Sequence, residues 1–416
     1  MELTIANAPG VPAPAGPAPT GPVTLAGRAL TLIHTGQAAT RSALTSRLGV
    51  TRGTTGAIAG ELRDLGLIVV DAGPGGGRQG RPSHRLLPDP RGPVALAAQV
   101  HPDGFEVALV GLGGTVAARL GRDGPVPADP ARALAPVAEA AAALLRESGR
   151  RCVGATVAVP TAVSRPAGTA VRALYTGWPT GAPVRDIFAA ALAGHGVAGR
   201  DEDPVGCDAV NDVNAIALAE HRHGAGRGAT HLLVVAAEHR GVGGALVLGG
   251  APYTGSTGLA MEAGHVSVDR DGRPCVCGNR GCLNVETDAE RFLELAGRAP
   301  APDEPVLRQA VAVLRAGYPA DDRVRAAADA VADRLGLGLA GLINVINPDQ
   351  VLLGGLHGHL LAANPERLRA AVAAGSPWGS GAAIPLGSCT LEHSGLIGAA
   401  ETAWQPVLDN PALLRG

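Results

Sequence analysis

The chain has no lysine among its 416 residues, so arginine and protonated histidine carry every side-chain positive charge. The formal net charge of -2 excludes a protein that is basic throughout, and any nucleic-acid contact must come from a local patch. Aromatic residues make up only 2% of the chain, which excludes base stacking as a general binding mode. The core must therefore be built from Ala, Val, Leu and Ile.

Long apolar segments are also missing. No apolar run reaches the roughly 18 residues that a membrane-spanning helix needs, and no basic start followed by an apolar segment marks a signal peptide. We therefore expect a cytoplasmic protein without membrane contact. In that compartment the six cysteines stay reduced and can bind a metal. The length predicts two to three domains.

Three of the six cysteines, Cys275, Cys277 and Cys282, fall within eight residues, and His265 lies just upstream. Three thiolates and an imidazole are typical ligands of a tetrahedral zinc ion, while Cys275 and Cys277 are too close in sequence for a relaxed disulfide. The spacing predicts a structural Zn²⁺ held by these four residues. The alternative is a cluster of buried free thiols beside an incidental histidine.

The first 90 residues divide into two parts. Residues 1–25 are rich in Pro and Ala, and we expect them to form a disordered tail. Residues 26–90 predict a short helix around Leu30, helices over 41–48 and 52–65, and two strands over 67–70 and 84–87 joined by a glycine-rich loop. Three helices followed by a hairpin indicate a winged helix-turn-helix, which would bind DNA.

Charge supports this interpretation, because the segment from Arg28 to Arg85 holds eight arginines against three acids in a chain that is slightly negative overall. The second helix of such a motif enters the major groove by its N-terminal residues, and the wing can reach a minor groove. The alternatives are a helical hairpin for protein contact or a solvated arginine face. The predicted DNA-binding residues are Arg41, Arg52, Thr54 and Thr55 in the helices, with Arg78 and Arg81 in the wing.

Residues 91–416 alternate strand-like and helix-like segments in two halves, which predicts an α/β body of two lobes with a cleft between them. Asn211, Asp212 and Asn214 begin a predicted helix in this body, where a carboxylate could point into the cleft. Simple helix capping is the alternative. At the end of this helix His221, Arg222 and His223 are interpreted as a solvated helix end, and a metal pair of the two histidines is the alternative.

Two stretches resemble a known family. Glu262-Ala263-Gly264-His265 followed by Cys-X-Cys-Gly-X-X-Gly-Cys-Leu over 275–283 resembles the signature of the ROK family, which groups sugar-responsive bacterial repressors with sugar kinases. Residues 48–68 and Gly80-Arg81-Pro82 are similar to the DNA-reading segments of the repressors. The resemblance implies an actin and hexokinase-like (ribonuclease H-like) body, in which a zinc loop over 262–286 presents Glu262 and His265 to a sugar.

The resemblance also bears on catalysis. In the kinase branch the residue matching Asp212 is the general base, and a first-strand Asp-X-Gly-Gly-Thr turn cradles ATP. Here Gln99, His101 and Pro102 stand in that turn, so the magnesium-holding charge and a backbone N–H are lost. Asn284 replaces a residue that is usually acidic in relatives that bind glucose-like sugars. We therefore expect no kinase activity, with Asp212 as a vestigial base.

Together these observations predict a DNA-binding transcriptional repressor of the ROK type, acting as a homodimer or homotetramer on double-stranded operator DNA. The alternatives are an ATP-dependent ROK sugar kinase with an accessory DNA-binding domain, and a scaffold whose head binds protein. The residues expected to bind a carbohydrate effector are Asn211, Asp212, Glu262, His265 and Asn284.

Overall fold

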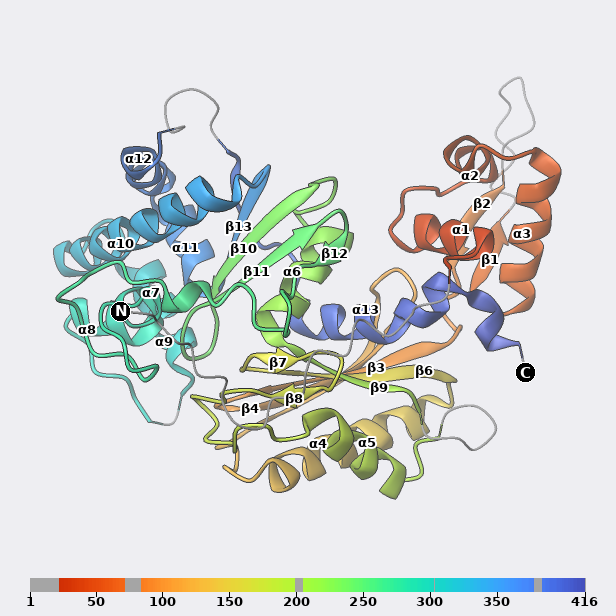
Figure 1. Cartoon of the computed structure of the whole chain (residues 1–416), viewed down its shortest axis with the longest axis horizontal. Helices are drawn as coiled ribbons and strands as arrows, with labels where there is room; N and C mark the ends of the chain where they lie inside the picture. The colour runs from red at the N-terminus through yellow and green to blue at the C-terminus, as the bar shows by residue number, and fades with distance from the viewer. Residues whose placement is uncertain (1–21, 72–83, 199–204, 303, 378–383, 416) are drawn as a thin grey trace, which may run out of the picture.

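The computed structural model describes residues 22–71, 84–198, 205–302, 304–377 and 384–415. They form a helical head and two lobes, each lobe built on a five-stranded sheet (Figure 1). This confirms the predicted α/β fold with an N-terminal winged helix-turn-helix. Among the described helices, none is both long and apolar enough to span a bilayer. The tail predicted over 1–25 lies outside the described residues except for its last four.

The head follows the sequence pattern closely because its helix caps are encoded locally. The Thr40 and Thr51 side chains accept backbone N–H groups at the starts of the second and third helices, and Gly49 ends the second helix with φ +65°. The elements are α1 (Leu25–His34), α2 (Arg41–Leu48), α3 (Arg52–Asp64), β1 (Ile68–Asp71) and β2 (Arg85–Pro88), the last two forming an antiparallel hairpin.

The first lobe is organised by the two faces of one sheet. Leu96 and Ala98 of its central strand pack into the core beneath α4 and α5, whereas the alternate residues Ala95 and Ala97 pack on the opposite side with α13. The strand order is β5-β4-β3-β6-β9. The elements are β3 (Val94–His101), β4 (Gly104–Gly111), β5 (Val116–Asp123), α4 (Pro130–Ser148), β6 (Cys152–Val159), α5 (Val184–Gly194), β9 (Cys207–Asn211) and α13 (Ser394–Asp409).

The second lobe repeats this plan with strand order β12-β11-β10-β13-β14. Leu232 and Val234 pack against α6 on one face, and Leu233 and Val235 pack on the other face against a group of helices. The elements are α6 (Asp212–His223), β10 (His231–Ala237), β11 (Gly243–Leu248), β12 (Ala251–Pro252), α7 (Leu283–Thr287), α8 (Ala289–Leu295), α9 (Val306–Gly317), α10 (Asp322–Ile346), β13 (Gln350–Gly354), α11 (Gly355–Ala363), α12 (Pro365–Gly375) and β14 (Leu386–Ser388).

Helix α13 joins the three parts, as it runs from between the lobes to the head (Figure 1). Gly398 of α13 lies so close to α6 that a Cβ there would be 1.7 Å from the carbonyl oxygen of Ala215. Trp404 is fully buried and donates its indole N–H to the carbonyl of Val110 in the first sheet. Leu30 of the head and Trp404 belong to the same apolar core. The head is thus packed onto the body through α13.

Candidate functional site

A cavity of about 310 Å³ lies between the lobes, at the N-terminal end of α6. Its walls include the start of α6, the end of β10 with the glycine loop at the start of β11, the loop over 160–162 after β6, the segment around Tyr175 and the cysteine-rich loop. The structure brings together here all five residues predicted to face an effector, which are Asn211, Asp212, Glu262, His265 and Asn284.

Residues at the start of α6 have two roles, because they cap the helix and they line the cavity. Asn211 is the N-cap, and its side-chain oxygen accepts the Asn214 N–H at 3.0 Å, so the capping alternative holds for this residue. Asp212 comes one position later, where its Oδ1 accepts the Val213 N–H at 2.8 Å. Asn214, which also lines the cavity, has a buried Oδ1 without a hydrogen-bond partner among the described residues. Asp212 thus lines the cavity, whereas the unpaired Asn214 Oδ1 is enclosed by protein atoms.

Three carboxyl groups share this cavity. Burial raises the pKa of Asp212 to about 7, and the nearby Glu262 adds to the effect. Burial and the charge of Asp212 likewise raise the pKa of Glu238 to about 7. Burial also raises the pKa of Glu262. Glu238 was missed in the sequence, although an acid directly after the apolar strand β10 and before a glycine loop was a usable signal. Near neutral pH the cavity holds carboxyl groups that are partly protonated.

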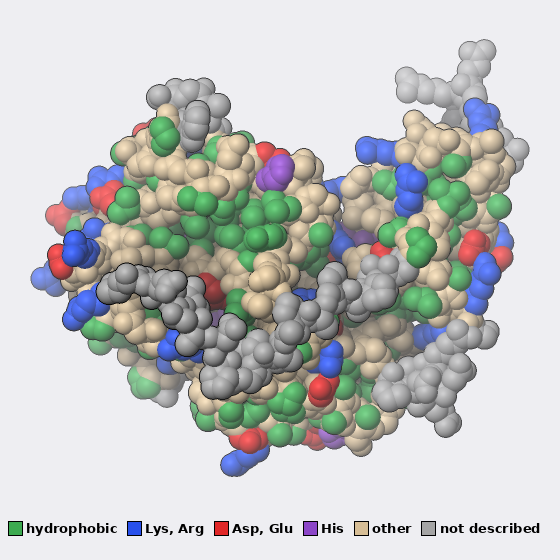
Figure 2. All heavy atoms as spheres, in the orientation of Figure 1, with side chains coloured by type: hydrophobic (Ala, Val, Ile, Leu, Met, Phe, Trp, Pro, Cys, Tyr) green, Lys and Arg blue, Asp and Glu red, His purple; other side chains and the backbone are tan. Residues whose placement is uncertain are grey.

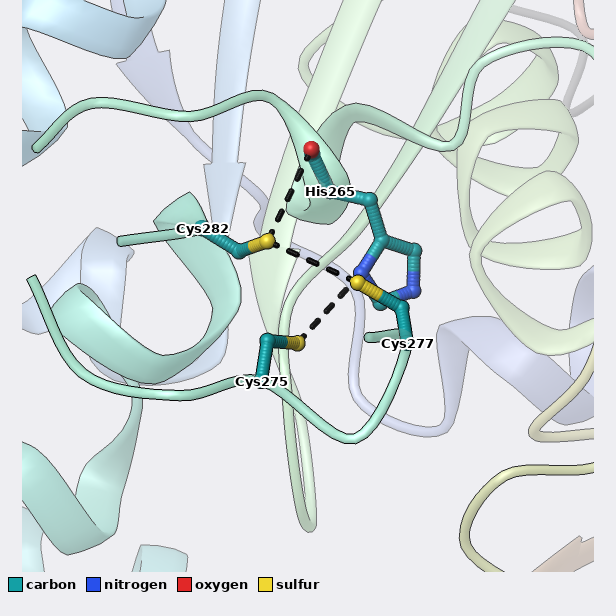
Figure 3. A group of neighbouring side chains, drawn as sticks. All are labelled: His265, Cys275, Cys277 and Cys282. Carbon is teal, nitrogen blue, oxygen red and sulfur yellow. Dashed lines mark hydrogen bonds between the residues drawn. The ribbon is translucent and has the colours of Figure 1, made fainter. Parts of the chain in front are cut away.

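The cysteine-rich loop forms a compact cluster beside the cavity (Figure 3). One ligand atom from each of His265, Cys275, Cys277 and Cys282 lies within 4.8 Å of all the others. The Cys277 and Cys282 sulfur atoms are 3.7 Å apart, as are the Cys275 sulfur and Nδ1 of His265. In a tetrahedral site with zinc–sulfur bonds of about 2.3 Å, two sulfur ligands lie about 3.8 Å apart. The cluster therefore fits a tetrahedral metal ion.

The orientation of His265 connects this cluster to the cavity. Nδ1 faces the thiols, while Nε2 lies 4.0 Å from a carboxylate oxygen of Glu262. A metal ion bound to Nδ1 would leave the ring proton on Nε2. This N–H would then point toward the Glu262 carboxylate. Gly264, between these residues, lies against the glycine loop, since a Cβ there would be 1.9 Å from the Val242 carbonyl oxygen. A metal ion would thus hold the cavity wall in place.

Asn284 and Tyr175 close another side of the cavity. The Asn284 oxygen accepts the Val242 N–H at 2.7 Å, and its amide nitrogen donates to the Tyr175 hydroxyl. Asn284 is only 2% exposed, so it supports the glycine loop from the protein interior. Gly241 makes this approach possible, because a Cβ there would be 2.6 Å from the Asn284 oxygen. The predicted effector contact of Asn284 therefore competes with two internal hydrogen bonds.

The turn expected to replace the ATP phosphate site lies at the end of β3. Gln99 is buried against the first turn of α13 at Gly395, where a Cβ would be 2.3 Å from the Gln99 oxygen. The His101 ring stacks on the His239 ring of the other lobe, with centroids 4.0 Å apart and an interplanar angle of 3°. Arg240 and Asp103 form an ion pair at 3.5 Å across the same gap. Side chains from both lobes thus fill this end of the cleft.

The head presents only part of the predicted DNA-binding set on its surface. Arg52 is exposed, and Thr54 is half-buried with its hydroxyl bonded to Thr51. The prediction for Thr55 is wrong, because this side chain is 1% exposed and is hydrogen-bonded to Thr45 of α2 at 3.0 Å. Arg41 is half-buried at the start of α2, whereas Arg78 and Arg81 lie outside the described residues.

Comparison with known proteins identifies the family to which this chain belongs. The sequence profile of the ROK family matches residues 103–405. The chain belongs to the ROK family. It is 33% identical over 211 residues to a protein bearing the name xylose repressor from Caldicellulosiruptor, covering 49% of this chain and 50% of that protein. It is 35% identical over 161 residues to a glucokinase from Thermotoga maritima, covering 35% of this chain and 49% of the enzyme.

A solved ROK family transcriptional regulator, described as a homolog of Escherichia coli MLC, superposes with a TM-score of 0.71 and 20% identity. The superposition covers 94% of this chain and 98% of that one, so the two share their fold over almost the full length. The chain spans about half the length of the curated relatives it matches. Both branches of the ROK family, repressors and kinases, are represented among these similar proteins.

Proposed function

We propose that this ROK protein is a DNA-binding transcriptional repressor that senses a sugar or sugar-derived effector in the cavity at the start of α6. The carrying observation is the combination of a winged helix-turn-helix head with a ROK body whose predicted sugar residues surround one cavity. The head would bind double-stranded operator DNA. Two heads are needed for half-sites about one helical turn apart, so the active form would be a homodimer or homotetramer.

A structural Zn²⁺ is part of this proposal. His265, Cys275, Cys277 and Cys282 would hold the ion, which would brace the loop without taking part in chemistry. The loop would then present Glu262 and the Nε2 of His265 to the effector, while Asp212 would accept hydrogen bonds from its hydroxyl groups.

The proposal predicts how D-glucose or D-xylose, the sugars named in the relatives, would bind. Glu262→Gln and Asp212→Asn should each weaken binding about tenfold or more, because each removes a charged acceptor. Binding should strengthen between pH 6 and 8, since the pKa of about 7 at Asp212 means that its accepting carboxylate form grows over this range. Isothermal titration calorimetry at both pH values measures these effects. Glu290→Gln, which lies outside the cavity lining, is the control, and an equal loss in that variant would contradict the assignment.

The kinase alternative and the repressor proposal predict different results in an assay of ATP-dependent sugar phosphorylation. With Gln99, His101 and Pro102 in the phosphate turn, ATP-dependent phosphorylation of D-glucose and D-xylose should remain at background in a coupled assay. Asp212→Asn should leave that background unchanged. A turnover that Asp212→Asn abolishes would instead establish a kinase, and the Thermotoga maritima glucokinase is the positive control for the assay.

A further inference from the structure

The C-terminal end of helix α6 makes contacts that were not predicted from the sequence. Its first residues line the cavity, while its last turn carries Arg222 and His223 about 17 Å away. The prediction of a solvated helix end is wrong for these two residues, because both reach the fully buried carboxylate of Glu401 on α13. Arg222 Nη1 lies 2.6 Å and His223 Nε2 lies 2.8 Å from its oxygens.

The same carboxylate also binds the head. Nε2 of His34, the last residue of α1, lies 2.8 Å from Glu401 Oε2 and 2.9 Å from Oε1. Nδ1 of His34 accepts the Gly113 N–H at 2.8 Å, so in the neutral ring Nε2 carries the proton and donates it to Glu401. The side chains of His34 and Glu401 are both inaccessible to solvent. Glu401 is therefore the point where α6 and the head meet.

His34, His223 and Glu401 have the ligand types of a zinc site, and their ligand atoms lie within 4.8 Å of one another. A metal-bound histidine ordinarily donates its second ring N–H to an acceptor. Here Nδ1 of His34 receives an N–H from Gly113, and Arg222 already binds the carboxylate. These contacts fit a hydrogen-bonded charge network better than a metal site.

Further contacts fix α1 at both ends to the same pair of helices. The backbone N–H and the hydroxyl of Thr24, the N-cap of α1, donate to the carbonyl of Asp409 at the end of α13. At the other end Arg227, which follows α6, donates to the carbonyl of Thr35 at 2.7 Å. A shift of α6 or α13 would consequently be transmitted to the whole of α1.

We propose that α6 is a lever that conveys the state of the cavity to the DNA-binding head through the junction of Arg222, His223, Glu401 and His34. This inference rests on the proposed function and names its regulation. A ligand that engages Asp212 shifts α6 along or about its axis, and Arg222 with His223 carries the shift into Glu401. The close backbone contact at Gly398 moves α13 with α6, and the head changes its orientation.

The lever is testable without a sugar, by hydrogen–deuterium exchange of the full-length protein. Asp212→Ala alters the cavity end of α6 and should change exchange in residues 25–35 about threefold or more. Glu262→Ala alters the same cavity from the cysteine-rich loop and should change it less than about twofold. In a Glu401→Gln background the effect of Asp212→Ala on these residues should become clearly smaller, while the contacts of Thr24 and Arg227 still transmit part of it. If Asp212→Ala does not fold, Asn214→Ser serves the same purpose.

Unchanged exchange in residues 25–35 of Asp212→Ala, or an equal change in Glu262→Ala, would overturn the lever. So would an effect of undiminished size in the Glu401→Gln background. A separate titration of the wild-type protein with D-glucose and D-xylose, with operator affinity as the readout, tests the proposed function. Because the exchange experiment uses no sugar, a failure of sensing and a failure of the lever give different results.

Discussion

Cys277→Ser is expected to lose the metal and, with it, most of the sugar affinity of the body, while DNA binding remains. Zinc should fall from about one ion per chain to less than about a tenth, because serine replaces one of four ligands. Without the ion the loop that carries Glu262 and His265 is no longer held against Val242, so sugar affinity should fall about tenfold or more. Metal analysis, calorimetry and a gel shift measure the three quantities.

Cys389→Ser is the matched control, since Cys389 lies outside the cluster. It should retain the metal and the sugar affinity. The head shares its core with α13 and the first sheet and not with the cysteine-rich loop, which is why DNA binding should survive in Cys277→Ser. A Cys277→Ser protein that keeps one zinc per chain would show that the cysteine is not a ligand.

The elements of the head could be predicted from the sequence because their limits are set by neighbouring residues. Thr40 and Thr51 cap helices within three residues of themselves, and Gly49 supplies the left-handed turn between them. The cluster of three cysteines and His265 was predictable for a similar reason, as three of its four residues lie within eight positions of one another. Such features depend on residues that are close in sequence and not on contacts with distant segments.

Other features depend on contacts between distant segments, and these escaped prediction. His34 and Glu401 are 367 residues apart, and neither has a pattern around it that indicates the other. Thr55 follows Thr54 at the start of α3, yet it faces α2, because one step along a helix turns a side chain by about 100°. The direction of a side chain at a helix start is set by the neighbouring helix, which the sequence of α3 alone does not define.

Arg52→Ala is expected to weaken binding to the DNA upstream of the protein's own gene about tenfold to a hundredfold, corresponding to about 1–3 kcal/mol. Arg52 is the first residue of α3 and is exposed, and it lies at the end of the helix that we expect to enter the major groove. Fluorescence anisotropy at several salt concentrations measures the affinity and its salt dependence.

Arg63→Ala is the matched control, because Arg63 lies on the same helix, near its opposite end, and pairs with Asp64 at 2.8 Å. It should change the affinity less than about twofold, and an equal loss in both variants would remove α3 as the reading helix. The salt dependence then assigns the role of Arg52. If it contacts a phosphate, Arg52→Ala lowers the salt slope by about one and weakens all sequences alike. If it contacts a base, the slope stays and discrimination at one position of the operator relaxes, because only base contacts carry sequence information.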